Sequence, residues 1–157
     1  MVNINKILAP TDCSEPSSDA LSYATQIATT FKADLILLKV FLPPVAHKYT
    51  EASYSLREIP VEKTREHLDE IKNFWQHCIK DGSTPEFVSL VGDPFDEIIR
   101  YAGEKEVDMI VMGTHGYTGF KHIFMGSVAE KVVRYSQVPV LTVKQKSFEY
   151  RQAGTPT

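Results

Sequence analysis

Half of the eight glycines in this chain fall in one segment of sixteen residues, "MGTHGYTGFKHIFMGS", which runs from Met112 to Ser127. Glycine reaches positive φ without a steric penalty, so a loop with several glycines can turn its backbone amides toward one centre. Gly126 and Ser127 then begin a predicted helix, whose free N–H groups and dipole attract phosphate. The segment therefore predicts a phosphate site that needs no strongly basic composition.

Apolar runs that favour strands alternate along the chain with amphipathic stretches that favour helices. These strands and helices must position the glycine-rich segment. Apolar residues recur at helical spacing from Ser17, Leu68, Pro94 and Ser127 onward. Five runs are typical of buried parallel strands, at 7–9, 33–41, 86–92, 108–113 and 138–143. The alternating order predicts an α/β fold with a parallel sheet, right-handed crossovers and helices on both faces.

Capping and breaking residues mark several boundaries of these elements. We expect Asp93 to cap the third helix, and Gly82 to end the second helix. Ser127 and Glu130 have the spacing of a capping box at the start of the fourth helix. Pro139 cannot donate to a sheet ladder, so the last strand is expected to start there or to lie at a sheet edge.

Ligands in open α/β sheets bind beyond the carboxyl ends of the strands, at the point where the strand order reverses. That rule directs attention to the loops after the first and fourth strands. The first loop contains Pro10, Thr11 and Asp12, and the second contains the glycines. Asp12 is as well suited to cap the first helix as to contact a ligand, and Ser127 can serve both roles at its own helix.

The glycine spacing excludes the two commonest nucleotide motifs, because G-x-x-x-x-G-K-S/T is absent and no G-x-G-x-x-G follows the first strand. Instead, Gly113, two residues, Gly116, nine residues, Gly126 and Ser127 follow one another. This spacing resembles the nucleotide-binding signature of the universal stress protein family. The resemblance extends from "ILAPTD" through "LILLKV" to "GSVAEKVVRYSQVPVLTV".

The resemblance implies a doubly wound three-layer sandwich whose five strands lie in the order 3-2-1-4-5. It also implies a site for ATP with Mg²⁺, in which Asp12 approaches the ribose or a metal ion and the Val40 backbone reads the adenine edge. The glycine loop and the following helix would hold the phosphates through their amides and the Ser127 hydroxyl. No residue is assigned a catalytic role. The implied nucleotide-binding residues are Pro10, Thr11, Asp12, Val40, Met112, Gly113, His115, Gly116, Gly126, Ser127 and Val128.

One position departs from the family pattern, because members commonly have an arginine after the second glycine and this chain has Tyr117. The change removes a cation that would contact phosphate, for which Lys121, His115 or His122 can compensate. A relative that binds no ATP and acts only through protein contacts therefore stays an alternative.

Composition limits the classes of function. Hydrophobic residues make up 43% of the 157 residues and the net charge is −3, which fits one globular domain and lacks the basic field of a nucleic-acid-binding protein. We expect that domain to span 1–144 and a polar, disordered tail to follow at 145–157. No secretory leader and no apolar run of ~20 residues is found, so we expect a cytoplasmic protein with no membrane partner. Cys13 and Cys78 make neither a disulfide framework nor a metal site, and we expect no redox role for Cys13 beside an acidic residue.

Motif and resemblance together favour a cytosolic ATP-binding stress-response protein that acts as a nucleotide-dependent binding module or sensor. An alternative is an enzyme, a slow ATPase or a protein that phosphorylates itself, although no base for phosphoryl transfer is recognisable. The family commonly dimerises through its last strand, and the apolar run 138–143 favours a homodimer, because a bare edge invites uncontrolled pairing. The polar stretch 45–60 is long for a connection, and we expect either a mobile loop or functional contacts there.

Overall fold

The computed structural model describes residues 3–42, 61–114 and 125–145. Strands and helices alternate strictly along them, as predicted, whereas the stretch 45–60 and most of the expected tail lie outside the described residues. The strands are β1 (Lys6–Pro10), β2 (Asp34–Phe41), β3 (Glu86–Val91), β4 (Met109–Gly113) and β5 (Val140–Val143). The helices are α1 (Glu15–Phe31), α2 (Val61–Cys78), α3 (Pro94–Glu104) and α4 (Ser127–Tyr135).

The five strands form one parallel sheet in the order β3-β2-β1-β4-β5, which confirms the predicted fold. The chain moves outward from β1 through β2 to β3, then crosses to β4 and β5 on the other side of β1. The strand order therefore reverses between β1 and β4, which pair directly, with Leu8 opposite Ile110. In sheets of this kind the reversal is the point at which ligands bind.

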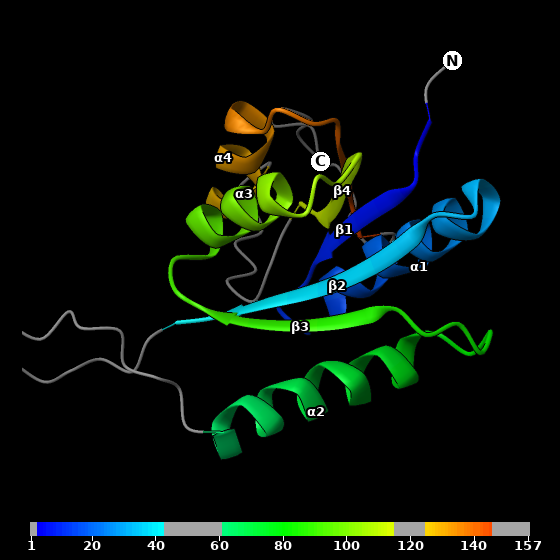
Figure 1. The fold of residues 1–157 in the computed structure, drawn as a ribbon, viewed down its shortest axis with the longest axis vertical. Coiled ribbons are helices and arrows are strands. Elements are labelled where there is room, and N and C mark those ends of the chain that lie inside the picture. Colours follow the sequence, from blue (N-terminus) through cyan, green and yellow to red (C-terminus); the bar gives the residue numbers. More distant parts are fainter. Residues whose placement is uncertain (1–2, 43–60, 115–124, 146–157) are drawn as a thin grey trace, which may run out of the picture.

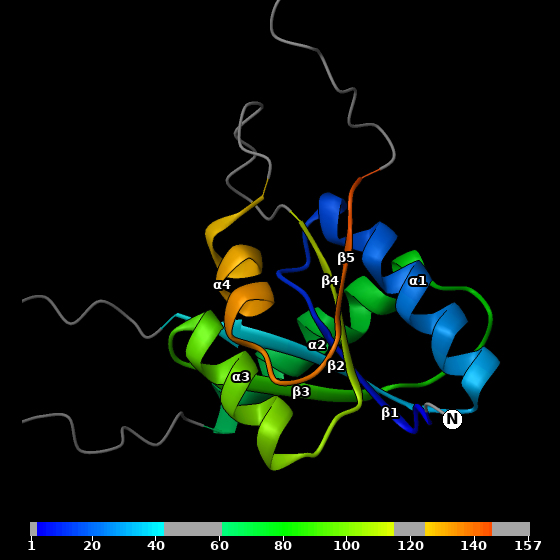
Figure 2. The same cartoon turned by 90° about the horizontal axis from the view of Figure 1, so that it is seen from above.

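Helices cover both faces of the sheet (Figure 1), and each face carries a hydrophobic core. On one face α1 and α2 pack against the sheet, and Ile7, Leu37 and Ile71 are fully buried there. On the other face α3 and α4 cover Leu8 and Ile110, so the sheet lies between two helix layers (Figure 2). Neighbouring residues of β1 enter opposite cores, which explains why the strand is apolar almost throughout. Within the described ranges, no helix has the length and apolar character needed to cross a membrane.

Two of the predicted boundaries are confirmed. Asp93 is the N-cap of α3, and its Oδ1 accepts hydrogen bonds from the amides of Phe95 at 3.0 Å and Asp96 at 3.2 Å. β5 begins directly after Pro139 and lies at the edge of the sheet. Local cap chemistry and the missing proline donor are sufficient to set these two boundaries.

The turn between α2 and β3 is built differently from the prediction. The helix ends at Cys78, so Gly82 does not terminate it, and the φ of +80° at Gly82 belongs to the turn that follows. Asp81 Oδ1 accepts hydrogen bonds from the amide of Ser83 at 2.8 Å and from its hydroxyl at 2.5 Å. The Trp75 indole N–H donates to the Ser83 carbonyl at 3.2 Å. These bonds tie the end of α2 to the segment that leads into β3.

Candidate functional site

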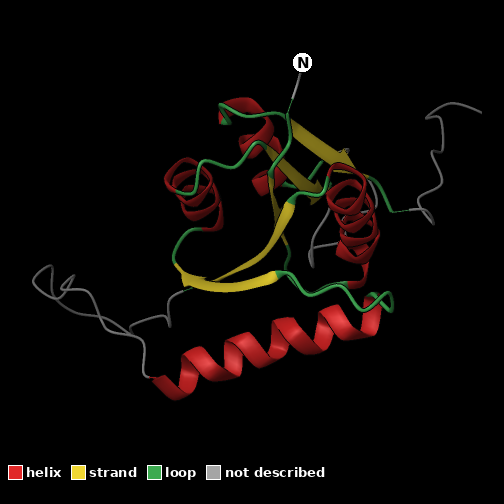
Figure 3. Ribbon diagram, turned by 45° about the vertical axis from the view of Figure 1, so that its right-hand side comes forward, coloured by secondary structure: helices red, strands yellow, loops and turns green. Residues whose placement is uncertain are grey.

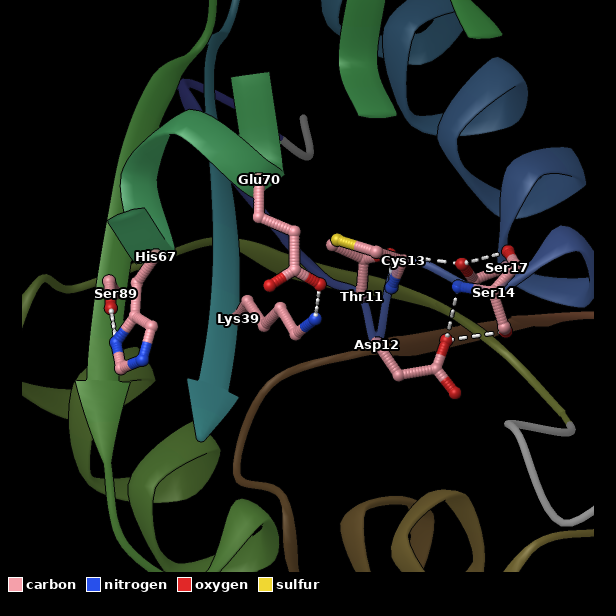
Figure 4. A network of polar contacts seen from close by, with 9 residues as sticks. All are labelled: Thr11, Asp12, Cys13, Ser14, Ser17, Lys39, His67, Glu70 and Ser89. Atoms are coloured by element: carbon pink, nitrogen blue, oxygen red, sulfur yellow. Dashed lines mark hydrogen bonds and ion pairs between the residues drawn. The ribbon is translucent and has the colours of Figure 1, made fainter. Parts of the chain in front are cut away.

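The loop between β1 and α1 is held by a compact hydrogen-bond network (Figure 4). The Thr11 amide donates to the Leu38 carbonyl at 2.8 Å, and the Thr11 and Ser17 hydroxyls lie 2.9 Å apart. The Ser17 hydroxyl donates to the Ser14 carbonyl at 2.7 Å, and the Cys13 amide donates to Thr11 Oγ1 at 3.0 Å. The buried side chains of Thr11 and Ser17 thus fix this loop at the carboxyl end of β1.

Asp12 is the acidic residue of the same loop. Its Oδ1 accepts hydrogen bonds from the amide of Ser14 at 3.0 Å and from the Ser14 hydroxyl at 2.5 Å. The N-cap of α1 is Ser14, so the interpretation of Asp12 as the cap of the first helix is wrong. The two bonds instead orient a half-buried carboxylate ahead of the helix.

Cys13 follows Asp12 in a left-handed backbone conformation, with φ of +62°. Its thiol points toward Lys39 and Glu70, away from the Asp12 carboxylate (Figure 4). Burial raises the pKa of the Cys13 thiol to about 11, opposed by Lys39 and supported by Glu70 and Asp12. The thiol is therefore protonated at neutral pH, and burial rather than the charge of Asp12 is the main cause.

The carboxyl end of β4 fixes the start of α4. Gly113 lies opposite Val143 of β5, and the Thr114 amide donates to the Val143 carbonyl at 3.0 Å. The Thr114 carbonyl in turn accepts a hydrogen bond of 2.6 Å from the Gly126 amide. Because Gly126 is the N-cap of α4, this bond holds the beginning of the helix next to the end of the strand.

The predicted capping box at the start of α4 is wrong. Gly126 is the N-cap and Ser127 is the first helical residue, so the Ser127 side chain is not in the cap position. Glu130 forms an ion pair of 2.8 Å with Arg134 instead of reaching back to the N-cap amide. Among the described residues no side chain caps α4, and the amides of Ser127 and Val128 have no acceptor there.

The two halves of the predicted site meet because β1 and β4 are neighbours. Leu8 pairs with Ile110, and the same register puts Pro10 level with Met112. Two predicted residues, His115 and Gly116, lie outside the described residues. The predicted residues that the structure brings to this end of the two strands are Pro10, Thr11, Asp12, Met112, Gly113, Gly126, Ser127 and Val128.

Val40 and Met112 differ from the loop residues, because their side chains pack in the core beneath α3 and α4. Met112 is only 6% exposed. The last pair between β1 and β2 joins Pro10 to Leu38, so the backbone at Val40 extends past the end of β1. A ligand at this edge of the sheet would therefore meet Val40 and Met112 through their backbone atoms.

A polar cluster that the sequence did not predict lies beside the loop, between β2 and α2. Lys39 forms an ion pair with Glu70, and the Lys39 ammonium lies 4.7 Å from the centroid of the Phe41 ring. The His67 ring stacks on Phe41 with centroids 3.5 Å apart, and its Nδ1 lies 3.3 Å from the Ser89 hydroxyl. Burial lowers the pKa of His67, so this ring is neutral at pH 7. The only signal in the sequence is that Lys39 interrupts the apolar run "LILLKVF".

A metal ion held by protein side chains alone is not supported in the part of the chain that the structure describes. No group of three or more His, Cys, Asp or Glu side chains there could hold one, and Cys13 and Cys78 are both free thiols. A metal ion at Asp12 would need further oxygen ligands from a bound phosphate, an arrangement typical of Mg²⁺. The Asp12 carboxylate at the carboxyl end of β1 fits that requirement.

The chain matches a known family over nearly its whole length. The model of the universal stress protein family matches residues 3–144. Universal stress protein MJ0531 of Methanocaldococcus jannaschii is 36% identical over 146 residues, which cover 92% of this chain and 84% of that protein. The residues matched by the family model include all nine strands and helices described above.

Two solved structures share the fold. Hypothetical protein MJ0577 of Methanocaldococcus jannaschii has a TM-score of 0.65 at 33% identity, and the match covers 93% of this chain and 99% of that one. A universal stress protein in complex with cAMP has a TM-score of 0.63 at 26% identity, and the match covers 90% of this chain and 98% of that one.

Proposed function

This chain belongs to the universal stress protein family, and we propose that it binds an adenine nucleotide at the carboxyl ends of β1 and β4. The finer proposal is that the nucleotide is ATP with Mg²⁺. The chain would then act in a stress response as a binding module or sensor whose conformation depends on whether the nucleotide is bound. The solved relative in complex with cAMP supports an adenine nucleotide as the class of ligand. The observation that carries the proposal is the start of α4, which no described side chain caps.

The start of α4 has the properties of a phosphate site. The amides of Ser127 and Val128 have no acceptor among the described residues, and the helix dipole adds positive potential at this end. Gly113 and Gly126 have no Cβ, so an anion can approach the backbone closely. A phosphate here would accept hydrogen bonds that α4 otherwise leaves to water.

The β1–α1 loop and the end of β2 supply the rest of the proposed site. Ser14 donates two hydrogen bonds to Oδ1 of Asp12, which orients the carboxylate toward a ribose hydroxyl or a metal ion. Bound Mg²⁺ would offset the negative charge of the phosphates. The backbone of Val40, past the last β1–β2 pair, offers groups that can read the adenine edge.

We further propose that the chain forms a homodimer through β5, and that this dimer surface responds to the bound nucleotide. β5 is an edge strand whose Val140 and Leu141 are only partly buried, and such an edge favours pairing with a second strand. α4 has nine residues and therefore spans about 13 Å between the phosphate end and the segment that enters β5. A shift of this helix on nucleotide binding would reach the edge strand directly.

Mass spectrometry of the nucleotide released from freshly purified, denatured protein tests the proposal. We expect an adenine nucleotide in the released fraction, and calorimetric heat when ATP with Mg²⁺ is added to the stripped protein. The absence of both would contradict nucleotide binding and would favour a family member that acts only through protein contacts.

A phosphate-release assay separates binding from catalysis. A binding module is expected to retain ATP without multiple turnovers, because efficient phosphoryl transfer needs a positioned group that activates the attacking oxygen. Multiple-turnover phosphate release that disappears in Asp12→Ala would instead favour the slow ATPase or the self-phosphorylating protein.

A further inference from the structure

A groove of about 370 Å³ lies between α2 and the start of β3. Among the described residues, its walls come from α2, from the turn that follows it and from the edge strand β3, which lies alongside α2 (Figure 3). Because Phe87 is near the amino end of a parallel strand, the groove lies at the opposite end of the sheet from the proposed nucleotide site. Nothing in the proposed nucleotide binding uses it.

The floor of the groove is apolar and rigid. Trp75 is 3% exposed and contacts Phe87 edge to face, with ring centroids 6.4 Å apart. The hydrogen bond from the Trp75 indole to Ser83 fixes the tryptophan ring, and the partly buried Ile79 completes the apolar lining. The volume suits one large apolar side chain, which would be held without rearrangement of the floor.

The backbone edge next to the groove has no partner strand within the described ranges. β3 is the first strand in the order of the sheet, and the Gly92 amide donates inward to the Phe41 carbonyl at 2.9 Å. In a parallel ladder alternate residues face the same neighbour, so Phe87, Ser89 and Val91 direct their N–H and C=O groups outward. Such a row of groups is a template for another extended chain.

The rim of the groove is positively charged. Lys72 and Lys80 are exposed, and neither forms an ion pair with another described residue. Asp81, next to Lys80, accepts hydrogen bonds from the Ser83 amide and hydroxyl in the turn. Glu86 alternates along β3 with Val88 and Leu90, which pack in the core beneath α3 and α4, so it lies on the other face of the sheet from the groove. Negative charge on a ligand would therefore be favoured at the rim.

We propose that this groove and the outer edge of β3 dock an extended, acidic segment of a partner protein. The segment adds a strand to β3, inserts one apolar side chain against Trp75 and Phe87, and places carboxylates near Lys72 and Lys80. Backbone pairing with β3 supplies general affinity, and the apolar floor and the two cations supply selectivity. The surface is separate from both the β5 edge and the nucleotide site.

The chain provides its own reporter for this proposal, because Trp75 is its only tryptophan. The probe is the capped peptide Thr-Glu-Thr-Phe-Thr-Glu-Thr, in which the two glutamates and the phenylalanine share one face of a strand. Titration into the full chain is expected to change Trp75 fluorescence saturably below ~1 mM, with slower hydrogen exchange of the Ser89 and Val91 amides. The same titration with ATP and Mg²⁺ present is expected to give the same result, so failure here is distinct from failure of nucleotide binding.

Matched variants and peptides decide each part of the proposal. Lys72→Glu and Lys80→Glu are each expected to weaken the probe about tenfold, whereas Arg65→Glu, the same charge change at an exposed position of α2 outside the groove, leaves affinity unchanged. One control peptide has lysine in place of both glutamates. If it binds as well as the probe, the proposed selectivity for negative charge is overturned. A second control peptide has proline in place of each threonine and cannot pair as a strand. If it binds as well as the probe, strand addition is overturned, and the groove is only a pocket for small ligands that are apolar and negatively charged. No saturable signal from any peptide would overturn the docking surface as a whole.

Discussion

α3 and α4 lie side by side on one face of the sheet, each beginning just beyond the end of a strand, yet their first turns differ. Asp93 caps α3 and accepts hydrogen bonds from two of its amides. Gly126 precedes α4, where no described side chain accepts from the corresponding amides. The start of α3 is capped by its own side chain, whereas the first amides of α4 have no acceptor among the described residues and can bind water or an anion.

The difference coincides with the proposed nucleotide site. A side-chain cap contributes about 0.5–2 kcal/mol, and its carboxylate also supplies the negative charge that the helix dipole attracts. No described side chain caps α4, and Glu130, the acidic residue of its first turn, forms an ion pair with Arg134. This helix begins at the reversal of strand order between β1 and β4, where α/β sheets bind ligands. α3 begins beyond the edge strand β3, away from that reversal, and there the cap is present. Sites that break a local rule for helix stability are those at which function is expected.

Giving α4 an aspartate cap like that of α3 should produce the largest loss of ATP affinity. Gly126→Asp introduces a carboxylate at a backbone conformation that any residue adopts, with φ of −67° and ψ of 152°. We expect ATP affinity to fall by about 100-fold or more, because the carboxylate takes the amides and repels the phosphates. The free energy of unfolding should stay constant or rise by a few tenths of a kcal/mol. Calorimetry with ATP and urea unfolding measure the two quantities.

Gly126→Asn is the control for charge. It offers a neutral cap to the same amides, so its loss of ATP affinity should be smaller, about tenfold. Wild-type affinity in the Gly126→Asp protein would remove the start of α4 from the site.

Removing the charge of Asp12 should have the next largest effect. Asp12→Asn keeps an oxygen that accepts from the Ser14 amide and hydroxyl, so the loop is expected to stay folded. ATP affinity should fall about tenfold with Mg²⁺ present, because a neutral amide is a much weaker ligand for this ion. With the metal chelated, the variant and the wild type should bind ATP equally. If Mg²⁺ raises the ATP affinity of the variant as much as that of the wild type, Asp12 does not contact the ion.

The alternation of strands and helices could be predicted from local signals in the sequence, whereas the order of the strands was implied by the resemblance to the family. The run 33–41 is apolar because β2 is covered on both faces, and Asp93 caps α3 through amides two and three residues away. The start of α4 was predicted one residue too late because a bond from a distant strand end decides it. The Gly126 amide donates to the Thr114 carbonyl, which makes Gly126 rather than Ser127 the last residue before the helix. Gly82 was misassigned for a similar reason, since the turn is fixed by bonds to Ser83.

Less of the candidate site and its surroundings could be predicted, because contacts between distant segments create them. The spacing of the glycines and the position of Asp12 directed attention to the carboxyl ends of β1 and β4, which the structure brings together. The pair of Lys39 with Glu70 joins residues 31 positions apart and has no periodic signature. The groove at Trp75 depends in the same way on how α2 lies against β3, and the sequence shows Trp75 only as an apolar position of a helix.

The smallest expected effect comes from removing the cap of α3. Asp93→Ala should lower the free energy of unfolding by about 1 kcal/mol, because the amides of Phe95 and Asp96 lose their acceptor. ATP affinity should stay the same, since this helix start is not part of the proposed site. Urea unfolding and calorimetry on the same sample measure both quantities. In the double variant with Gly126→Asp, the changes in stability should add, because each substitution alters a different helix start. Loss of ATP affinity in Asp93→Ala alone would mean that α3 also shapes the nucleotide site, and the contrast between the two helix starts would then no longer distinguish a structural cap from a binding site.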